Sequence, residues 1–268
     1  MGQPATSRGR SIPRQGEKAM SRWVEGRVVR LQPWTDKLYS IQVEAEIARF
    51  VAGQFTRLAL EIDGEVVGRP YSFLNSPGDP LHEFYFVTVP GGPLTSRLIT
   101  LAPGDPILIA RQAAGFFTLN ELPDAGVLWM LSTGTAIGPF LSILANGEVW
   151  RRYPRIVLVH AVRTADELGY RERIQTCLQQ HPGQLQYIPF VSREDTGFAI
   201  KGRVPAAIES GLLEQRAGLT IATENSQVMI CGNPGMVHDT VEVLQARGLK
   251  KNRRREPGHI TTEQYWKA

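Results

Sequence analysis

A four-residue stretch, Arg69-Pro70-Tyr71-Ser72, places a cation, an aromatic ring and a hydroxyl together at the end of a β-like run. Side chains alternate in an extended segment, so Arg69 and Tyr71 share one face, and Pro70 marks an edge or irregular position. A ligand with a phosphate and a large planar ring, such as a flavin nucleotide, would use all three side-chain types. An edge strand with a surface arginine and a packed tyrosine explains the same residues, so other segments must decide.

The stretch Thr133-Gly134-Thr135-Ala136-Ile137-Gly138-Pro139 follows an apolar run and contains mostly small residues. Small residues let backbone N–H groups approach a pyrophosphate at a helix N-terminus, and Pro139 suits the first helical turn. The glycine spacing differs from the Gly-x-Gly-x-x-Gly dinucleotide fingerprint, so that motif is not present. A tight turn without a ligand is the alternative.

Three arginines are expected at one rim of a parallel sheet. Arg163 and Arg193 follow predicted strands, and Arg203 precedes a probable helix. Ligands of such sheets bind outside the carboxyl ends of the strands, where an arginine cluster can recognise an adenosine 2′-phosphate. The cluster therefore predicts a preference for NADP over NAD, although any single arginine could be a solvated surface residue.

Two further segments could carry chemistry. Glycines in Pro90-Gly91-Gly92-Pro93 precede a short helical stretch with Leu94 and Thr95 near its start, which indicates either a second phosphate cradle or helix capping. Cys231 ends an apolar strand before Gly232. Without a nearby histidine a structural cysteine is the default interpretation, and the chain has no metal-ligand spacing.

The segment from Arg247 onward is strongly basic, and the chain ends in aromatic residues. Between Arg247 and Arg255 there is no acidic residue, so the segment is either a solvated helix end or a docking edge for an acidic protein. The docking candidates are Lys250, Lys251, Arg253, Arg254 and Arg255. Tyr265 and Trp266 are unusual for a terminus and suit a stacking role.

Composition predicts an ordinary globular chain. It has 268 residues, 42% hydrophobic and 21% charged, with no apolar run long enough to cross a membrane. The two cysteines lack cluster spacing, which favours a reducing cytoplasm. Of the net charge of +4, residues 1–19 carry +3 through four cations and one acid, so about +1 remains for the rest. We interpret 1–19 as a disordered basic leader.

The order of elements predicts two domains, at 20–121 and 122–268. Six short alternating segments suggest a six-stranded antiparallel Greek-key barrel: Val24–Leu31, Leu38–Glu44, Phe55–Ile62, Tyr71–Leu74, Glu83–Val89 and Ile107–Ala110. Apolar runs that alternate with helical patterns then suggest a doubly wound parallel sheet with flanking helices. Its predicted strands are Val127–Leu131, Ile156–Ala161, Leu185–Val191 and Gln227–Cys231, and its helices Pro139–Asn146, Asp166–Gln180, Val204–Ser210 and Met236–Arg247.

Taken in order, these motifs resemble the bacterial flavodoxin/ferredoxin-NADP reductases from about Trp23 to Trp266. The resemblance implies an FAD-binding barrel followed by an NADP-binding domain. Hydride would pass between the nicotinamide and flavin N5 at their junction, and single electrons would pass to a separate flavodoxin or ferredoxin.

The resemblance also implies residue roles. Arg69 would contact the flavin phosphates, Tyr71 would pack on the ring system, and Ser72 would lie near N5, with Cys231 at the nicotinamide. The implied FAD contacts are Arg69, Pro70, Tyr71, Ser72, Val87, Val89, Leu94, Thr95, Thr135 and Trp266. The implied NADP contacts are Gly134, Thr135, Arg163, Arg193, Arg203, Cys231 and Gly232.

Three other functions remain open from the sequence. An oxygenase reductase component would share the fold and cofactors but serve another acceptor. A non-catalytic flavin-binding regulator would bind without turnover. A nucleic-acid-binding protein is favoured only by the arginine-rich ends.

Overall fold

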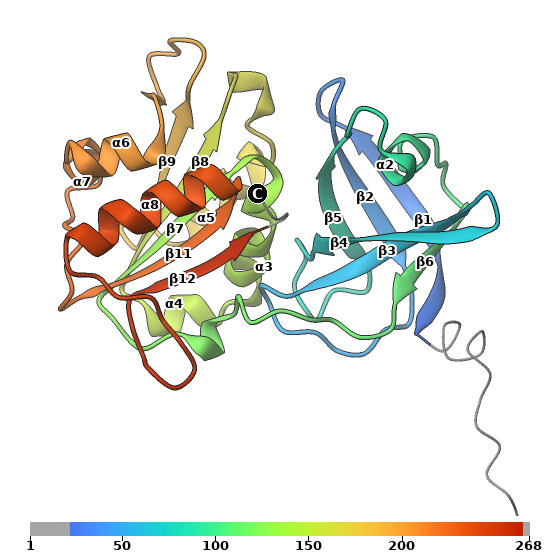
Figure 1. Cartoon of the computed structure of the whole chain (residues 1–268), viewed down its shortest axis with the longest axis horizontal. Helices are drawn as coiled ribbons and strands as arrows, with labels where there is room; N and C mark the ends of the chain where they lie inside the picture. Colours follow the sequence, from blue (N-terminus) through green and yellow to red (C-terminus); the bar gives the residue numbers. More distant parts are fainter. Residues whose placement is uncertain (1–21, 265–268) are drawn as a thin grey trace, which may run out of the picture.

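The computed structural model describes residues 22–264, which form two bodies packed side by side (Figure 1). The body formed by the earlier part of the chain is a β-barrel, and the later part forms a sheet covered by helices. The predicted leader at 1–19 and the aromatic pair Tyr265 and Trp266 lie outside the described residues.

The first body is one antiparallel sheet with the strand order β4-β3-β6-β1-β2-β5. Its six strands are β1 (Trp23–Pro33), β2 (Leu38–Glu44), β3 (Phe55–Ile62), β4 (Glu65–Ser72), β5 (His82–Val87) and β6 (Pro106–Ala110). One short helix, α2 (Pro93–Leu98), follows β5. β6 returns to lie between β3 and β1, so the predicted six-stranded Greek-key sheet is confirmed.

The edges of this sheet meet directly after β4. An isolated bridge joins Phe73 to Phe84, and the Leu74 N–H donates to the Glu83 carbonyl over 2.9 Å. The segment predicted as a strand at Tyr71–Leu74 was placed wrongly, because the strand begins at Glu65 and ends at Ser72. Pro70 lies inside it and is tolerated because β4 is an edge strand that pairs only with β3.

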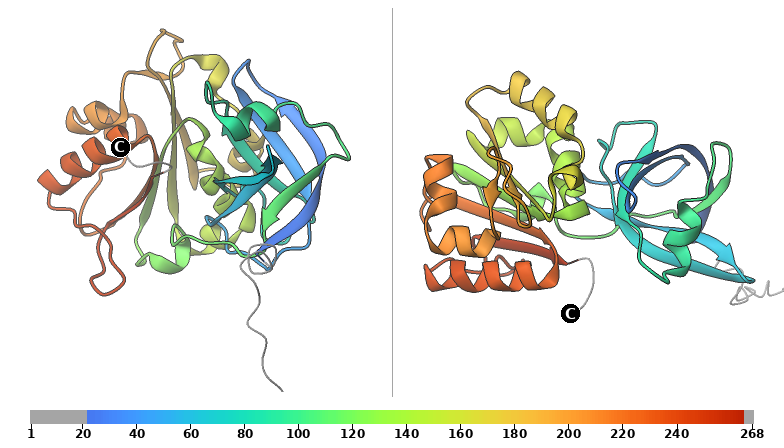
Figure 2. Two further views of the ribbon diagram at one scale, coloured as in Figure 1. Left: turned by 45° about the vertical axis from the view of Figure 1, so that its right-hand side comes forward. Right: turned by 90° about the horizontal axis from the view of Figure 1, so that it is seen from above.

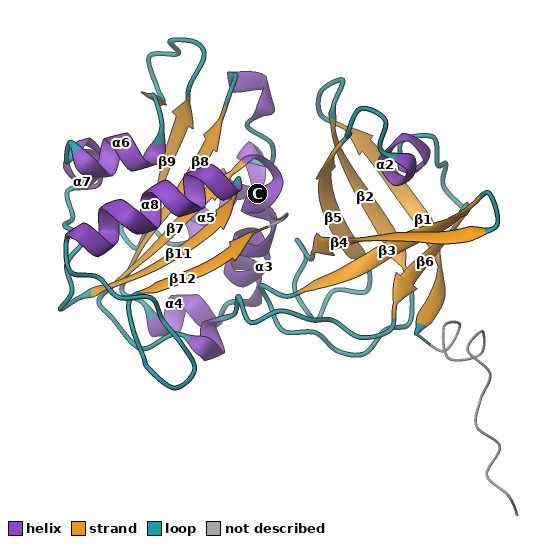
Figure 3. Ribbon diagram, in the orientation of Figure 1, coloured by secondary structure: helices purple, strands orange, loops and turns teal. Residues whose placement is uncertain are grey.

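The second body is a parallel sheet with the strand order β10-β9-β8-β7-β11-β12 (Figure 3). Its strands are β7 (Val127–Thr133), β8 (Arg155–Val162), β9 (Leu185–Val191), β10 (Ile200–Lys201), β11 (Ser226–Gly232) and β12 (Ile260–Gln264). The helices are α3 (Gly138–Asn146), α4 (Glu148–Arg152), α5 (Arg171–Gln180), α6 (Val204–Glu209), α7 (Leu212–Ala217) and α8 (Pro234–Ala246), with short 3₁₀ turns η1 (Leu119–Glu121), η2 (Gly134–Ile137) and η3 (Ala165–Glu167).

Both faces of the parallel sheet are covered (Figure 2). Alternate residues of β7 enter different cores: Leu128 and Met130 pack with α3, α4 and α5, whereas Trp129 and Leu131 pack with α6, α7 and α8. This two-sided burial explains the continuous apolar run of β7. The predicted doubly wound fold is therefore confirmed.

Several element boundaries differ from those predicted. The helix predicted at Asp166–Gln180 begins only at Arg171, because Tyr170 adopts a left-handed backbone conformation that interrupts it. The basic segment is not a helix end, since α8 stops at Ala246 and the following residues form a loop. β10, β12, α4 and α7 were not predicted, because each is short and lacks a clear periodic pattern. Within residues 22–264, no helix combines the length and apolar character that crossing a membrane requires.

Candidate functional site between the barrel and the parallel sheet

A cleft of about 750 Å³ opens between the two bodies. One wall comes from the loops that follow the carboxyl ends of β7, β8, β9 and β11, where ligands of parallel sheets bind. The opposite wall comes from the barrel, through the loop at 35–38 and Val87. Seven predicted site residues line it: Val87, Gly134, Thr135, Arg163, Arg193, Arg203 and Gly232.

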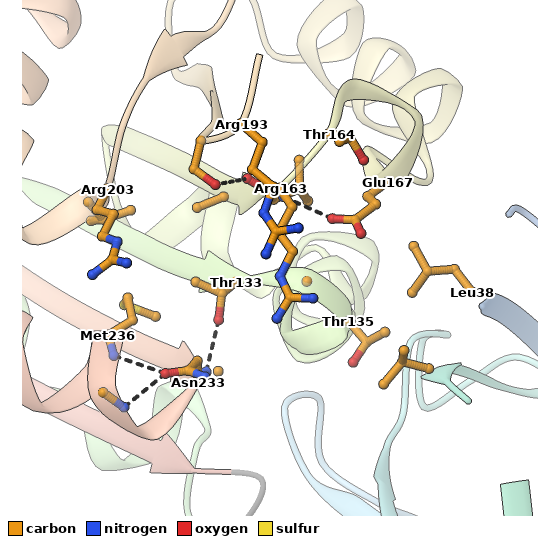
Figure 4. Close-up of a pocket in the computed structure, with 18 of the residues that line it drawn as sticks. Leu38, Thr133, Thr135, Arg163, Thr164, Glu167, Arg193, Arg203, Asn233 and Met236 are labelled. Carbon is orange, nitrogen blue, oxygen red and sulfur yellow. Dashed lines mark hydrogen bonds between the residues drawn. The ribbon is translucent and has the colours of Figure 1, made fainter. Parts of the chain in front are cut away.

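The three predicted arginines converge on this cleft (Figure 4). The backbone N–H of Arg193 donates to the Arg163 carbonyl over 2.9 Å, which joins two neighbouring strand ends. Arg203 occupies the N-cap position of α6, without a side-chain capping bond. None of the three makes an ion pair with a carboxylate of residues 22–264. Their mutual repulsion would be relieved by an anion, so the rim suits a phosphate.

The turn that begins at Gly134, directly after β7, is supported by a histidine of the neighbouring strand. Gly134 has a φ of 55°, and a Cβ at this position would meet no atom within 4 Å, so its outer side is open. Nε2 of His160, in β8, lies 2.9 Å from the Gly134 carbonyl oxygen. Burial lowers the pKa of His160 to about 4, so the neutral ring donates its Nε2 proton to this carbonyl. The turn is therefore a fixed, open cradle.

The end of β11 closes against the end of β7. Gly232 has a φ of 139°, and a Cβ there would lie 2.0 Å from Oγ1 of Thr133, so only glycine fits. The N–H of Asn233 donates to the same oxygen over 2.8 Å. Asn233 also caps α8, accepting hydrogen bonds from the N–H groups of Gly235 and Met236 (Figure 4).

On the barrel side, the Arg69–Ser72 stretch ends β4. Arg69 is exposed, whereas Tyr71 is half-buried and packs edge-on against Phe86 with 6.0 Å between ring centroids. Burial raises the pKa of Tyr71 to about 12, with a smaller lowering by Arg69, so Tyr71 keeps its proton. Oγ of Ser72 is buried without a hydrogen-bond partner in the described part of the chain. Such a hydroxyl is free to bond a bound group or a water molecule.

The other predicted barrel contacts surround the start of α2. Val87 and Val89 are 40% and 54% exposed, so their apolar side chains are open to solvent. Oγ1 of Thr95 accepts the Val89 N–H over 3.1 Å and thereby shapes the loop. Leu94 is only 2% exposed and packs in the barrel core, so a ligand would meet its backbone rather than its side chain.

Cys231 is fully buried at the end of β11, where it is in register with Glu263 of β12. Oε2 of Glu263 is buried without a partner among residues 22–264, and burial raises the pKa of this carboxyl to about 7. Sequence reasoning missed Glu263 because β12 was not predicted. It also missed His160 and the barrel loop at 35–38, which carry no local motif.

The basic segment forms a loop before β12. Asn252 fastens it to the segment between the domains by donating to the Glu121 carbonyl over 2.6 Å. The guanidinium of Arg254 lies 5.1 Å from the ring centroid of Phe116, which is 65% exposed. Lys250, Lys251 and Arg253 are exposed beside it. The loop therefore presents exposed cations, of which Arg254 lies against Phe116. Two of these cations also lie near carboxylates, Arg253 at 3.9 Å from Glu256 and Arg254 at 3.8 Å from Glu121.

Comparisons with known proteins show the family of this chain. Residues 130–242 match the oxidoreductase NAD-binding domain family. Over 248 residues, the chain is 51% identical to the flavodoxin/ferredoxin–NADP reductases of Shigella flexneri and of Escherichia coli (strain K12), covering 92% of this chain and 100% of each relative. The chain belongs to the flavodoxin/ferredoxin–NADP reductase family.

A solved member of the flavodoxin/ferredoxin–NADP reductase family shows the same architecture. The crystal structure of a ferredoxin NADP+ reductase from Neisseria gonorrhoeae with bound FAD and NADP has a TM-score of 0.87 and 31% sequence identity to this chain. The matched region covers 91% of this chain and 99% of the Neisseria gonorrhoeae chain. The predicted family and enzyme class are confirmed, whereas the predicted residue roles and domain limits stay predictions.

Proposed function

We propose that this reductase uses FAD to exchange a hydride with NADP(H) and to exchange single electrons with a flavodoxin or ferredoxin. The flavin would bind at the barrel, within 20–121, and NADP at the parallel sheet, within 122–268. When bound, FAD supplies the conversion between two-electron and one-electron transfer. The protein supplies binding, orientation and electrostatics.

One observation carries this proposal: three arginines that make no ion pair within residues 22–264 share one cleft with the open turn at Gly134. Arg163, Arg193 and Arg203 would hold the 2′-phosphate. The open side of Gly134 would admit the pyrophosphate against backbone N–H groups. The opposite barrel wall leaves room for a nicotinamide to extend toward the flavin.

The barrel residues fit a flavin as well. Ser72 offers a buried hydroxyl without a partner among the described residues, which suits a ring nitrogen. Arg69 offers an exposed cation for phosphate, and Tyr71 offers a neutral ring for packing. Val87 and Val89 offer open apolar surface, and we assign Thr95 to the loop around the pyrophosphate. We assign Trp266 to the adenine, Thr135 to the junction of both cofactors, and Cys231 and Gly232 to the nicotinamide.

The absorption spectrum of the purified protein tests this function. We expect a flavin spectrum that bleaches when NADPH is added without oxygen, and recovers when oxidised flavodoxin or ferredoxin is added. A colourless protein that cannot be reconstituted with FAD would exclude the proposal. A flavin that NADPH does not bleach would instead favour a flavin-binding regulator.

We further propose that the basic loop with Lys250, Lys251, Arg253, Arg254 and Arg255 docks the electron carrier. Flavodoxins and ferredoxins are acidic, so a focused basic patch would speed their association at low salt. The exposed ring of Phe116 beside Arg254 gives this surface an apolar centre.

Neutralising three of the loop's cations tests docking. We expect Lys250, Lys251 and Arg253 changed to Gln to slow carrier reduction at low ionic strength and to leave NADPH oxidation by a small-molecule acceptor intact. The matched control neutralises three exposed arginines of other elements, Arg151, Arg155 and Arg216. If both triple variants slowed carrier reduction equally, the effect would come from the overall charge of the protein and not from docking at this loop. We assign the protein to the cytoplasm, because its two cysteines are both free thiols.

A further inference from the structure

The start of α5 is strained and pressed against the barrel. Tyr170 has φ and ψ values of 61° and 23°, a left-handed conformation that is unfavourable for a residue with a side chain. The preceding Gly169 permits no side chain, since a Cβ there would lie 2.6 Å from the hydroxyl oxygen of Tyr85 on β5. Strain of this kind persists where surrounding contacts hold a residue in place.

Those contacts come from the barrel. The Tyr170 ring lies 4.6 Å from that of Trp34 and 5.2 Å from that of Tyr85, measured between centroids. Its hydroxyl donates to Oε1 of Glu83 over 2.8 Å and also contacts Oγ of Ser40. Tyr170 is only 7% exposed. A side chain of the parallel-sheet domain is therefore inserted into a polar and aromatic socket of the other domain.

Two further contacts extend this attachment. Nη1 of Arg173 lies 3.6 Å from Oε2 of Glu83, and Nη2 donates to the Leu74 carbonyl over 3.1 Å. Oγ of Ser142, on α3, donates to the Asn75 carbonyl over 2.7 Å. Helices α5 and α3 thus hold the same barrel segment.

This segment lies between the two proposed half-sites. Leu74 is two residues beyond Ser72, and Ser142 is in the helix that follows the Gly134 turn. A Cβ on Gly138, the first residue of α3, would be 4.0 Å from Cδ1 of Leu74. The flavin-side motif and the nucleotide-side motif are therefore joined through a few direct contacts.

We propose that Tyr170 is a positioning residue for hydride transfer, which sets the parallel-sheet domain against the barrel so that the two bound cofactors meet at reacting distance. The proposal rests on the proposed function. Reacting atoms must approach to about 3–3.5 Å, and a misplacement of about 1 Å can cost about 100-fold in rate. Within residues 22–264, the hydrogen bonds and ring contacts of the Tyr170 side chain go to Trp34, Ser40, Glu83 and Tyr85, none of them a predicted cofactor contact. Tyr170 would therefore act through Glu83 and Leu74.

The Tyr170→Phe variant tests this inference because it removes the hydroxyl and keeps the ring. In the FAD-loaded enzyme we expect single-turnover flavin reduction by saturating NADPH to slow by about 10-fold or more. We expect the affinity for adenosine 2′,5′-bisphosphate, which reaches only the arginine rim, and the FAD content to stay unchanged. Tyr187→Phe is the control, because that hydroxyl has no partner among the described residues.

Hydrogen exchange gives a second readout that does not depend on activity. We expect Tyr170→Phe to speed exchange at 74–85 and 169–175, and Tyr187→Phe to leave both segments unchanged. If Tyr170→Phe does not fold, Ser142→Ala removes an independent contact and should act in the same direction.

Two results for Tyr170→Phe would overturn the inference. One is an unchanged rate of flavin reduction. The other is a rate that falls only as much as the FAD content and the affinity for adenosine 2′,5′-bisphosphate fall. A wild-type protein without FAD or NADPH oxidation would refute the proposed function, and exchange at 74–85 would still decide whether Tyr170 joins the domains.

Discussion

Nε2 of His160 lies 2.9 Å from the carbonyl oxygen of Gly134, and the imidazole is fully buried in the central part of the parallel sheet. The bond ties the shape of the glycine turn to a ring that must stay neutral. Because its pKa falls to about 4, this ring also makes stability depend on pH.

The His160 pKa predicts a loss of stability in mild acid. The unfolded imidazole takes up a proton near its ordinary pKa of about 6.5, whereas the folded one resists down to about 4. The contribution of His160 to the free energy of unfolding is complete above pH 6.5. It is lost as the pH falls toward 4, and the loss amounts to about 3 kcal/mol at most.

Denaturant unfolding of wild type and His160→Gln between pH 8 and pH 4.5 measures this effect. The variant can still donate to Gly134 but does not titrate, so we expect a shallower decline in its free energy of unfolding. Parallel declines would contradict the role of His160. His160→Phe, which leaves the carbonyl without its donor, should cost about 1–3 kcal/mol at pH 8.

The three arginines at the cleft predict a preference for NADPH over NADH. Substituting Arg163, Arg193 and Arg203 singly with Ala should weaken NADPH binding by about 10-fold to 100-fold each, since a hydrogen bond to a charged group contributes about 1.5–3 kcal/mol. NADH lacks the 2′-phosphate, so its KM should change little. Steady-state kinetics with both nucleotides check this, with Arg151→Ala as the control. An equal loss for NADPH and NADH would contradict 2′-phosphate recognition.

We expect the Ser72→Ala substitution to affect the stability of the FAD-free protein and the rate of flavin reduction in different directions. In the FAD-free protein its hydroxyl is buried without a partner in the described chain, so Ser72→Ala should leave the free energy of unfolding unchanged or raise it by about 1 kcal/mol. In the FAD-loaded protein the same change should slow flavin reduction by about 10-fold, the loss expected for one hydrogen bond. Unfolding curves with and without FAD, together with stopped-flow reduction, measure both. A destabilised apoprotein would show that Ser72 serves the fold.

Glu263 predicts a stability change of the opposite sign to that of His160. Burial raises its folded pKa to about 7, so the unfolded state releases this proton first as the pH rises. The contribution is present below about pH 4.5, the ordinary range for glutamate, and is lost as the pH approaches 7. Glu263→Gln cannot ionise, so its melting temperature should match wild type at pH 4 and exceed it at pH 8. Equal melting temperatures at both values would contradict this.

The barrel and the parallel sheet were predictable because their patterns are local. Phe55–Ile62 is a short run rich in Phe, Leu, Ile and Thr, and the Asp63-Gly64 turn that ends it has positive φ at both residues, as a tight hairpin requires. β7 is continuously apolar because both of its faces are buried. These signals depend only on neighbouring residues.

Contacts between distant segments were not predictable. Nothing near Tyr170 in the sequence indicates that its hydroxyl reaches Glu83, 87 positions earlier. His160 reaches Gly134 only because β7 and β8 are adjacent in the sheet. Such contacts depend on the packing of elements, which no local pattern encodes.

By itself, the sequence determined the fold class, the candidate cofactor motifs and the family, because periodicity and motif spacing are properties of contiguous residues. Only the tertiary structure decided that the three arginines face one cleft, that the basic segment is a loop beside Phe116, and that Tyr170 joins the domains. Those facts follow from how two separately encoded domains pack, which depends on surfaces built from residues far apart in the chain.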